Sequence, residues 1–385
     1  MNQKKNQALR ILLVYKVFFP DSIGGGEQVL LELGRGFLKL GHHVAVLTAS
    51  HYIKTPEISF YEGIKVYRYP PDFEIFSTPF IFRALKDFKR IQAEFDIVNF
   101  HFPYPFGDLM MLACGLTKPL VVTYHCDIVK QKFLKIIYQP LMKQLLRQAQ
   151  AIIPTSEQYL ASSPHLIPYR SKCSAIPLGL DKARYPQADS GNVAVLRKQY
   201  GERFFCFVGI FRYYKGLAHL VKAASDVKCT IVIVGDGPQR LKLQALAGRG
   251  KTGNLIFLGK VDDQLKVDIL SASYGFVFPS NYRSEAYGLS LVEAAMYGRP
   301  MISCEIDTGT SFVNRHGQTG IVVPHSNPAA LAEAMSRLLA NPDLAEQYGN
   351  AAREWSQIAL TAEKMCDSYN DLFQRIHQNN QPSAI

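Results

Sequence analysis

Short apolar stretches alternate along the chain with segments whose apolar residues recur every three or four positions. Residues 10–17 form the first apolar stretch and are expected to be a buried strand. A turn with three glycines follows, and Val29, Leu33 and Phe37 then recur at helical spacing before a second apolar stretch at residues 43–48. This order of strand, glycine-rich turn, helix and strand is typical of a βαβ unit, so the pattern predicts parallel α/β architecture.

The alternation falls into two series. The first also contains expected strands at residues 97–101 and 120–124. In the second, strands are expected at residues 204–209, 230–234, 255–258, 275–278 and 301–303. We therefore expect two facing Rossmann-like parallel α/β domains with a cleft between them, because such sheets bind ligands beyond the carboxyl ends of their strands. The expected parts are a domain at residues 1–180, a linker at 181–200, a domain at 201–355, and a C-terminal helix and tail at 356–385, where the last long helical pattern covers 354–377.

Composition fits this architecture and adds one asymmetry. The chain is 48% hydrophobic and 19% charged, which excludes a disordered chain. Its 385 residues are enough for two or three domains, each with its own core. The net charge is +11, of which residues 1–180 carry +8 and residues 181–385 carry +3. The first half is therefore expected to face something anionic, such as a membrane surface, a phosphorylated substrate or nucleic acid.

The seven cysteines and the length of the apolar runs exclude further classes of protein. No Cys-x-x-Cys occurs and the number of cysteines is odd, which disfavours a disulfide framework or a structural zinc site. No run approaches the ~18 apolar residues that a membrane span requires. The sequence predicts a soluble or peripheral protein with reduced thiols.

A glycine-rich turn, Gly24-Gly25-Gly26, follows the first expected strand. Glycines there can let a phosphate approach the backbone beside a helix start, or they can simply form a tight turn. A dinucleotide cofactor is disfavoured, because the Rossmann fingerprint requires an acidic residue at the end of the second strand, and residues 47–50 contain none.

Two further motifs follow strands of the second series. Arg212 and Lys215 stand beside Gly216, where two cations suit a diphosphate group, although a solvated basic loop is the alternative. Glu285 and Glu293 are eight residues apart with Gly288 between them, so a helix starting near Gly288 would offer two carboxylates and free amides together. An exposed helical glutamate pair is the alternative.

These motifs together resemble the family 4 glycosyltransferases of the GT-B fold, over essentially the whole chain. The most specific match is Glu285-x7-Glu293. Residues 303–324 resemble bacterial O-antigen enzymes that use GDP-mannose or GDP-rhamnose. The supporting segments are Gly24-Gly25, His125, Thr155-Ser156-Glu157, Ile176-Pro177-Leu178-Gly179, Lys215-Gly216, Val234-Gly235-Asp236-Gly237-Pro238 and Phe257-Leu258-Gly259.

The resemblance implies a role for each motif residue. His125 would contact the donor sugar near the reaction centre, Lys215 would neutralise the departing diphosphate, and Glu285 would bind hydroxyls of the donor hexose. These three are the candidate catalytic residues. The candidate donor-binding residues are Gly24, Gly25, Arg212, Lys215, Glu285, Tyr287, Gly288, Leu289 and Glu293.

The family retains the anomeric configuration and needs no metal ion or other cofactor. The sequence agrees in having no Asp-x-Asp, the motif that holds a divalent ion in GT-A-like enzymes. It departs from the family at Ile210, where an arginine is usual. We expect Arg212 to reach the phosphate instead, with Lys215 acting more nearly alone as the alternative.

The resemblance implies a nucleotide-sugar donor, expected to be a GDP-sugar, and a lipid-diphosphate-linked glycan acceptor in O-antigen or lipopolysaccharide synthesis. Residues 128–147 interleave cations, among them Lys130, Lys132 and Lys135, with large apolar side chains. Such a segment can lie on an anionic membrane surface or pack on a core with a solvated basic face. Residues 80–90 are a second stretch of this kind. The expected location is cytoplasmic, peripheral on the inner face of the cell membrane.

Two rival functions remain. Another GT-B nucleotide-sugar enzyme, such as an epimerase, would share the fold and the donor. A basic nucleic-acid-binding protein ranks well below, because the sequence contains no helix-turn-helix, RNP-type or zinc signature. Nucleic acid is therefore not an expected partner.

Overall fold

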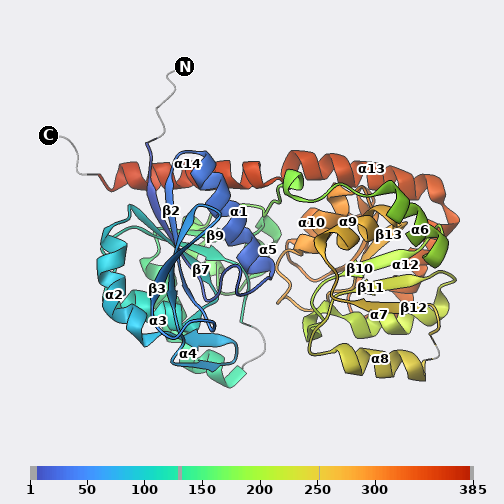
Figure 1. Ribbon diagram of the computed structural model, residues 1–385, viewed down its shortest axis with the longest axis horizontal. Helices are drawn as coiled ribbons and strands as arrows, with labels where there is room; N and C mark the ends of the chain where they lie inside the picture. The colour runs from blue at the N-terminus through green and yellow to red at the C-terminus, as the bar shows by residue number, and fades with distance from the viewer. Residues whose placement is uncertain (1–6, 129–131, 251, 382–385) are drawn as a thin grey trace, which may run out of the picture. The chain divides into compact units, whose positions relative to one another are not determined.

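Two parallel α/β units make up the chain (Figure 1). The structure, a computed structural model, describes residues 7–128, 132–250 and 252–381, without the side chains of residues 132–137. The first unit comprises Met1–Leu178 and Ala362–Ile385, and the second comprises Gly179–Thr361. The predicted α/β class and the two series of strands are thus confirmed.

The first unit is built on a seven-stranded sheet in the order β3-β4-β2-β1-β7-β8-β9. All neighbours are parallel except the β3–β4 pair at one edge. The strands are β1 (Arg10–Val14), β2 (His43–Ala49), β3 (Glu57–Tyr61), β4 (Ile64–Tyr69), β7 (Ile97–Phe102), β8 (Leu120–Tyr124) and β9 (Ala151–Pro154). A separate antiparallel hairpin consists of β5 (Phe73–Ile75) and β6 (Thr78–Phe80).

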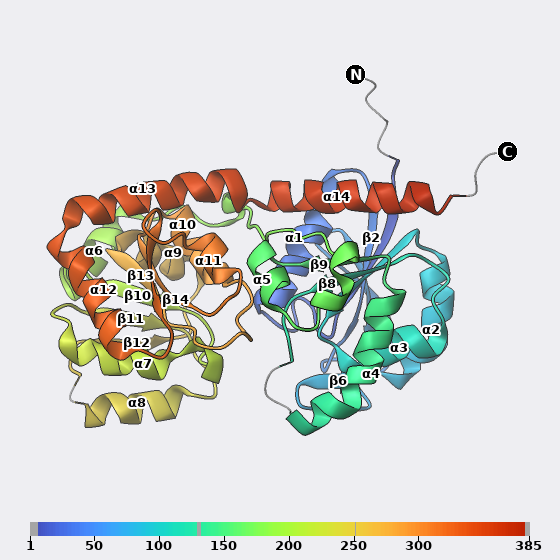
Figure 2. The same ribbon diagram turned by 180° about the vertical axis from the view of Figure 1, so that it is seen from behind.

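Helices cover both faces of this sheet. They are α1 (Gly25–Lys39), α2 (Phe82–Ala93), α3 (Pro105–Cys114), α4 (Lys132–Gln148), α5 (Glu157–Ser162) and α14 (Ala362–Asn379). Helix α1 packs beside α14, and α3 packs against α2 and α4 (Figure 2). The β1–α1–β2 and β7–α3–β8 crossovers run in opposite directions along the sheet. Because both are right-handed, α1 and α3 lie on opposite faces.

The second unit has a six-stranded, wholly parallel sheet in the order β12-β11-β10-β13-β14-β15. Its strands are β10 (Phe205–Val208), β11 (Ile231–Val234), β12 (Leu255–Gly259), β13 (Gly275–Phe278), β14 (Met301–Glu305) and β15 (Gly320–Pro324). Its helices are α6 (Ser190–Tyr200), α7 (Leu217–Ala223), α8 (Arg240–Arg249), α9 (Asp263–Ala272), α10 (Leu289–Met296), α11 (Thr310–Val313), α12 (Pro328–Ala340) and α13 (Pro342–Ala359).

The structure corrects the predicted linker at residues 181–200. This stretch belongs to the second unit and ends in α6, which packs on α9. The Asp268 carboxylate accepts hydrogen bonds from the Asp189 amide at 2.8 Å and the Asn192 side chain at 2.9 Å. These contacts fix the segment to its own domain, although its glycine and proline content suggested a free connection.

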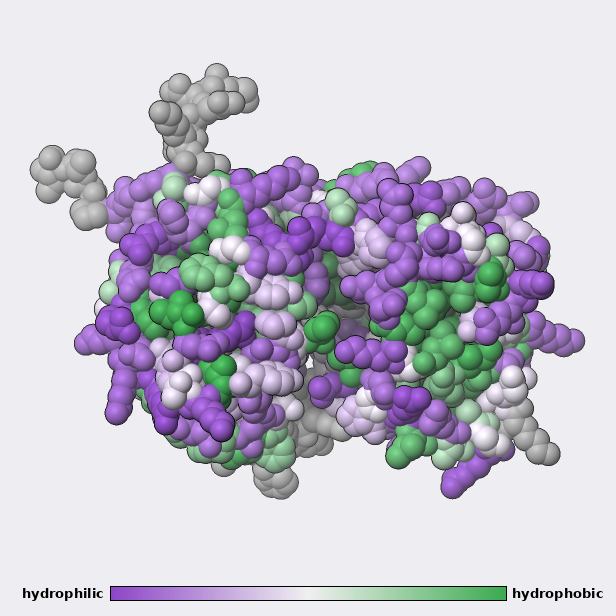
Figure 3. Space-filling model, viewed as in Figure 1, coloured by the Kyte–Doolittle hydropathy of each residue, from purple (hydrophilic) through white to green (hydrophobic). Residues whose placement is uncertain are grey.

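The predicted C-terminal segment, residues 356–385, is also divided. The helical pattern at 354–377 is two helices, α13 and α14, broken at Leu360 and Thr361. Leu360 is fully buried and its carbonyl accepts from the Leu180 amide at 3.0 Å. Helix α14 joins the first unit and buries one face there, while Figure 3 shows hydrophilic residues along its outward side.

Helix α4 contains residues 132–147 of the stretch 128–147 that was predicted to meet either a membrane or the core. Lys130 lies outside the described residues, as do the side chains of Lys132 and Lys135. In the described part, Met142, Leu145 and Leu146 are buried, so that part of the helix packs on the core. Within the described residues, none of the helices is long and apolar enough to span a membrane.

Candidate functional site

A buried ion pair lies beyond the carboxyl ends of β10 and β13. Lys215 ends the short 3-10 turn Tyr213–Lys215, and Glu285 lies in the loop between β13 and α10. The Lys215 Nζ and Glu285 Oε2 atoms are 2.5 Å apart, and the two side chains are only 11% and 10% exposed. The Ser280 hydroxyl donates to the same carboxylate oxygen at 3.0 Å. Two of the three predicted catalytic residues are therefore in direct contact.

Gly216 allows Lys215 to reach this position. Its φ of 64° is in the left-handed region, which glycine adopts without strain. A Cβ atom at Gly216 would lie 1.9 Å from the Pro279 carbonyl oxygen, so only glycine lets the two backbones approach this closely. The Lys215 Nζ then lies 4.7 Å from the centre of the Phe278 ring. The lysine is thus placed by a backbone contact with the end of β13.

Helix α10 begins beside the ion pair, as the sequence predicted. Gly288 is its N-cap, with a φ of 86°, and Leu289 is its first residue. The first amides of a helix have no acceptor within the helix and carry its positive end. Such a helix start favours an anionic ligand. The predicted amides at Tyr287, Gly288 and Leu289 therefore lie where phosphate binding is chemically reasonable.

Glu293 lies one turn into α10 and has its own partners. Its Oε1 atom accepts from Lys266 Nζ at 3.0 Å and from the Tyr185 hydroxyl at 3.1 Å. Burial acts to lower the pKa of Lys266, but the Glu293 and Asp263 carboxylates outweigh it and raise the pKa above its ordinary value. No residue in the described part of the chain donates to Oε2 of Glu293, which leaves that atom as an acceptor for a ligand hydroxyl.

Arg212 lies at the start of the turn that carries Lys215. It is exposed, and its guanidinium forms no ion pair with any residue that the structure describes. A long cation on the exposed side of this turn can move toward an anion, whereas Lys215 is held in place. The geometry is compatible with the predicted substitution of Arg212 for the family's usual arginine.

The third predicted catalytic residue, His125, belongs to the first unit. It follows β8 directly, and its amide donates to the Phe102 carbonyl at 2.9 Å. Its Nε2 atom lies 2.9 Å from Nδ1 of His101. Burial, together with the nearby charge of Lys16, lowers the pKa of His125 to about 4, so its ring is neutral at physiological pH.

His101 and its neighbour Asn99 are site residues that the sequence analysis missed. Both are fully buried on β7. Their one sequence signal is a spacing of two within a strand, which puts both side chains on the same face.

The glycine-rich turn has a local packing role. Gly24 is the N-cap of α1. A Cβ there would lie 2.8 Å from Oε2 of Glu27, whose carboxylate is buried and accepts from the Ser22 hydroxyl at 2.6 Å. A Cβ at Gly26 would lie 2.5 Å from the Tyr15 hydroxyl. A Cβ at either position would require the Glu27 or Tyr15 side chain to move. The donor-binding role of Gly24 and Gly25 stays a prediction.

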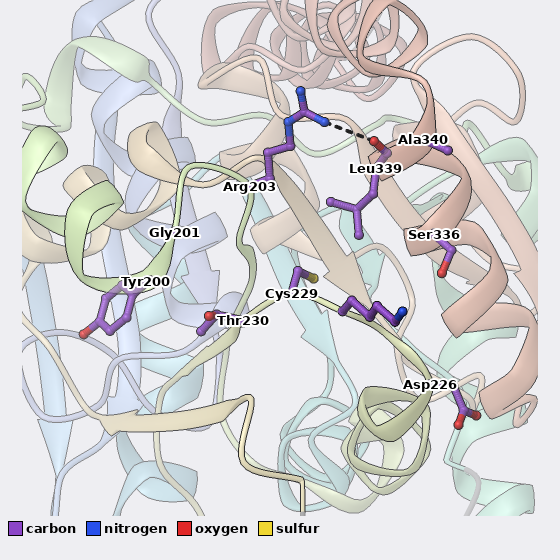
Figure 4. A pocket seen from close by; sticks show the side chains of 10 residues that line it. Tyr200, Gly201, Arg203, Asp226, Cys229, Thr230, Ser336, Leu339 and Ala340 are labelled. Atoms are coloured by element: carbon purple, nitrogen blue, oxygen red, sulfur yellow. Dashed lines mark hydrogen bonds between the residues drawn. The ribbon is translucent and has the colours of Figure 1, made fainter.

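A large surface pocket of about 750 Å³ lies elsewhere in the second unit (Figure 4). Arg203, Cys229 and Thr230, which line it, precede β10 and β11. The pocket is therefore at the amino ends of the strands, opposite Lys215 and Glu285. Ligands of parallel sheets bind at the carboxyl ends, so the ion pair marks the better candidate site. No three His, Cys, Asp or Glu side chains of the described chain are grouped to hold a metal ion.

Comparisons with known proteins agree over both units. Residues 23–184 match the family described as Glycosyltransferase Family 4, and residues 192–355 match Glycosyl transferases group 1. The D-rhamnosyltransferase WbpZ of Pseudomonas aeruginosa is 43% identical, covering 91% of this chain and 92% of that protein. The O-antigen chain mannosyltransferase C of Escherichia coli is 42% identical, covering 95% and 98%. The solved sucrose-phosphate synthase from Thermosynechococcus elongatus has a TM-score of 0.81 at 22% identity, covering 97% of this chain and 100% of that one, and so shares the fold.

Proposed function

The chain belongs to the family 4, or group 1, glycosyltransferases, which have the GT-B fold, and on that premise we propose that it transfers mannose or a 6-deoxy-mannose from a GDP-sugar to a lipid-linked glycan in O-antigen synthesis. The observation that carries the proposal is the similarity, at 43% and 42% identity over more than nine-tenths of the chain, to a rhamnosyltransferase and a mannosyltransferase. The GDP moiety and the lipid-linked acceptor are the finer parts of the proposal.

The chemistry of the proposed reaction centres on the charge of the leaving group. A nucleoside diphosphate departs with negative charge, which the site must stabilise in the transition state. Lys215, Arg212 and the first amides of α10 supply positive potential from two loops that follow strands of the second sheet. We propose that they do so without a divalent ion.

The Lys215–Glu285 ion pair is the proposed resting arrangement of this site. A donor would replace it, with its phosphate taking Lys215 and its hexose hydroxyls taking Glu285. Lys215 would then exchange one anionic partner for another, and Glu285 would exchange an ammonium donor for hydroxyl donors, so neither nearly buried group would lose its hydrogen bond. The Ser280 hydroxyl would keep Glu285 oriented during this exchange. The free Oε2 of Glu293 would accept from a ribose hydroxyl.

The proposed stereochemical course is retention. In it, the acceptor hydroxyl attacks the anomeric carbon on the face from which the diphosphate leaves. The carbon–oxygen bond to the diphosphate breaks, the new glycosidic bond forms, and the leaving phosphate accepts the proton of the acceptor hydroxyl. His125 would contact the donor sugar near this centre, in a neutral state.

A position at the inner face of the membrane completes the proposal. The exposed side of α2 carries Arg83, Lys86 and Lys89. The neighbouring β5–β6 hairpin exposes Ile75 and Phe76, which is 67% exposed at the turn. Cations beside exposed apolar side chains favour an anionic lipid surface, where a lipid-linked acceptor would be found.

A thermal-shift panel of GDP-, UDP-, ADP- and dTDP-sugars tests the donor. A ligand that binds only the folded state at a hundred times its Kd stabilises it by about 2.7 kcal/mol. We expect GDP-mannose or GDP-rhamnose to raise the melting temperature most. A larger shift with a UDP-sugar and none with either GDP-sugar would refute the proposed donor while leaving the family unaffected.

A further inference from the structure

A hydrogen-bonded chain of three side chains leads from the interior of the first sheet to His125. Asn99 and His101 are fully buried and lie two residues apart on β7. The Asn99 Oδ1 atom is 3.0 Å from His101 Nε2, and His101 Nδ1 is 2.9 Å from His125 Nε2.

The orientation of the Asn99 amide is set by two residues of the neighbouring strand β8. Its Nδ2 atom lies 3.2 Å from the Val121 carbonyl oxygen and 3.0 Å from the Thr123 hydroxyl. A backbone carbonyl only accepts hydrogen bonds, so the amide NH₂ must face Val121. The carbonyl oxygen of the Asn99 amide therefore faces His101.

The tautomers of both histidines follow from this orientation. The Asn99 carbonyl oxygen only accepts, so His101 must donate through Nε2. A neutral imidazole has one N–H group, which makes Nδ1 of His101 an acceptor. His125 must then donate to it through Nε2. The other ring nitrogen of His125, Nδ1, is left with a lone pair.

Both rings are neutral, as these tautomers require. Burial, with a smaller contribution from His125, lowers the pKa of His101 well below its ordinary value. Burial and the Lys16 charge lower the pKa of His125 to about 4. The His125 side chain keeps partial exposure, and its Nδ1 forms no hydrogen bond to any residue that the structure describes.

We propose that Asn99 and His101 are positioning residues that hold His125 in its Nε2–H tautomer, so that its Nδ1 atom is presented as a hydrogen-bond acceptor. The inference rests on the proposed role of His125 at the donor sugar. It deepens that role, because His125 then accepts a hydrogen bond from a substrate hydroxyl and does not donate one. Asn99 and His101 act only through His125.

Nitrogen-15 NMR of the full-length protein, labelled at its histidines, reads the tautomers directly at neutral pH. The His125 signals are assigned by their loss in His125→Gln. We expect a protonated Nε2 and an unprotonated Nδ1 for His125. A protonated Nδ1, or signals averaged between the two tautomers, would overturn the proposal. No sugar nucleotide is needed, so the result is independent of the proposed donor and reaction.

Substitutions at Asn99 and His101 test whether these residues set the tautomer of His125 or only fill space in the core. Asn99→Leu removes the acceptor for His101, which can then donate through Nδ1, so we expect His125 to gain the Nδ1–H tautomer. His101→Gln keeps a carbonyl for His125 and an amide donor for Asn99, and should preserve the parent tautomer. Tyr369→Phe is the control, because the Tyr369 hydroxyl contacts Thr123, 3.1 Å away, whose side chain hydrogen-bonds to Asn99 and not to either histidine. Unchanged His125 signals in a folded Asn99→Leu protein would contradict the positioning role.

Discussion

Lys215 and Glu285 form an ion pair with each other and are both proposed to contact the donor, so substitutions there should affect both stability and turnover. Turnover should fall by at least ~100-fold in Lys215→Ala and in Glu285→Gln, the range for losing one preorganised charge contact. Each single change also leaves a nearly buried partner without its counter-charge, at a cost of about 3–5 kcal/mol in the free energy of unfolding. The double variant should regain part of that stability but none of the turnover.

Chemical denaturation and initial rates on the same preparations would check this prediction. Arg35→Ala is the matched control, because Arg35 forms an equally short ion pair with Glu62 and neither residue is a candidate site residue. It should lose some stability and keep the parent turnover. A folded Lys215→Ala enzyme with near-normal rates would show that the phosphate site lies elsewhere.

At the residue scale, the sequence predicted the charged residues of the second unit better than the histidine chain of the first. Glu285, Gly288 and Glu293 could be placed because their spacing specifies a loop, a helix start and the first helical turn. Asn99 and His101 could not, since an isolated polar residue inside an apolar strand carries no information about its partner across the sheet. The ion pair between Lys215 and Glu285 likewise required the structure, because the two residues are 70 positions apart.

At the scale of elements, the turn that carries Lys215 depends on one backbone contact. Gly216→Ala would set a Cβ 1.9 Å from the Pro279 oxygen and impose left-handed strain, so we expect a loss of about 2–4 kcal/mol in unfolding free energy. Turnover should fall at least ~10-fold, since Lys215 must move with its neighbour.

Gly41→Ala provides the matched comparison, because Gly41 also has a positive φ, of 84°, but a Cβ there would have no neighbour within 4 Å. Gly41→Ala should lower the unfolding free energy only by the left-handed strain, about 1–2 kcal/mol, and leave turnover unchanged. Urea midpoints and rates for the two variants would measure both effects. Equal losses of stability would mean that the Pro279 contact is unimportant.

Helix α2 allows a test of the membrane proposal with described side chains. Replacing Arg83, Lys86 and Lys89 by Gln should weaken binding to anionic vesicles by about 3 kcal/mol at most, at roughly 1 kcal/mol per cation. Co-sedimentation with anionic and neutral vesicles, at low and high salt, is the measurement.

The control for this test replaces three exposed lysines of the second unit, Lys198, Lys222 and Lys228, by Gln. It removes the same charge and should leave vesicle binding close to that of the parent. If both triple variants bind alike, the attraction comes from net charge alone and α2 is an ordinary basic-faced helix.

Elements buried on both faces were predictable, and exposed or short ones were not. Strands β8 and β13 begin and end where the apolar runs do. The edge strand β3 is largely exposed and the β5–β6 hairpin is short, so neither leaves a continuous apolar run. The break between α13 and α14 was missed because residues on both sides continue the helical pattern, and only the burial of Leu360 marks it.

At the scale of the whole molecule, the predicted GT-B fold is confirmed by the two parallel sheets and the two matching glycosyltransferase families. Buried strands alternating with helices made its α/β class predictable. The assignment of the linker and of the last helix needed tertiary contacts, since residues 181–200 and α14 each join a unit through particular side chains. The charge excess of residues 1–180 agrees with the membrane proposal, which itself stays a prediction.

The measurement that tests the central claim most directly is hexose transfer by the purified full-length protein from GDP-mannose and GDP-rhamnose to a lipid-diphosphate-linked sugar, after exhaustive chelation of metal ions. Mass spectrometry would detect the product and NMR would give the configuration of the new linkage. Lys215, Arg212 and the α10 amides are proposed to stabilise the diphosphate, so we predict undiminished transfer with retained configuration. Transfer that is lost on chelation and restored by manganese, or an inverted linkage, would contradict the account.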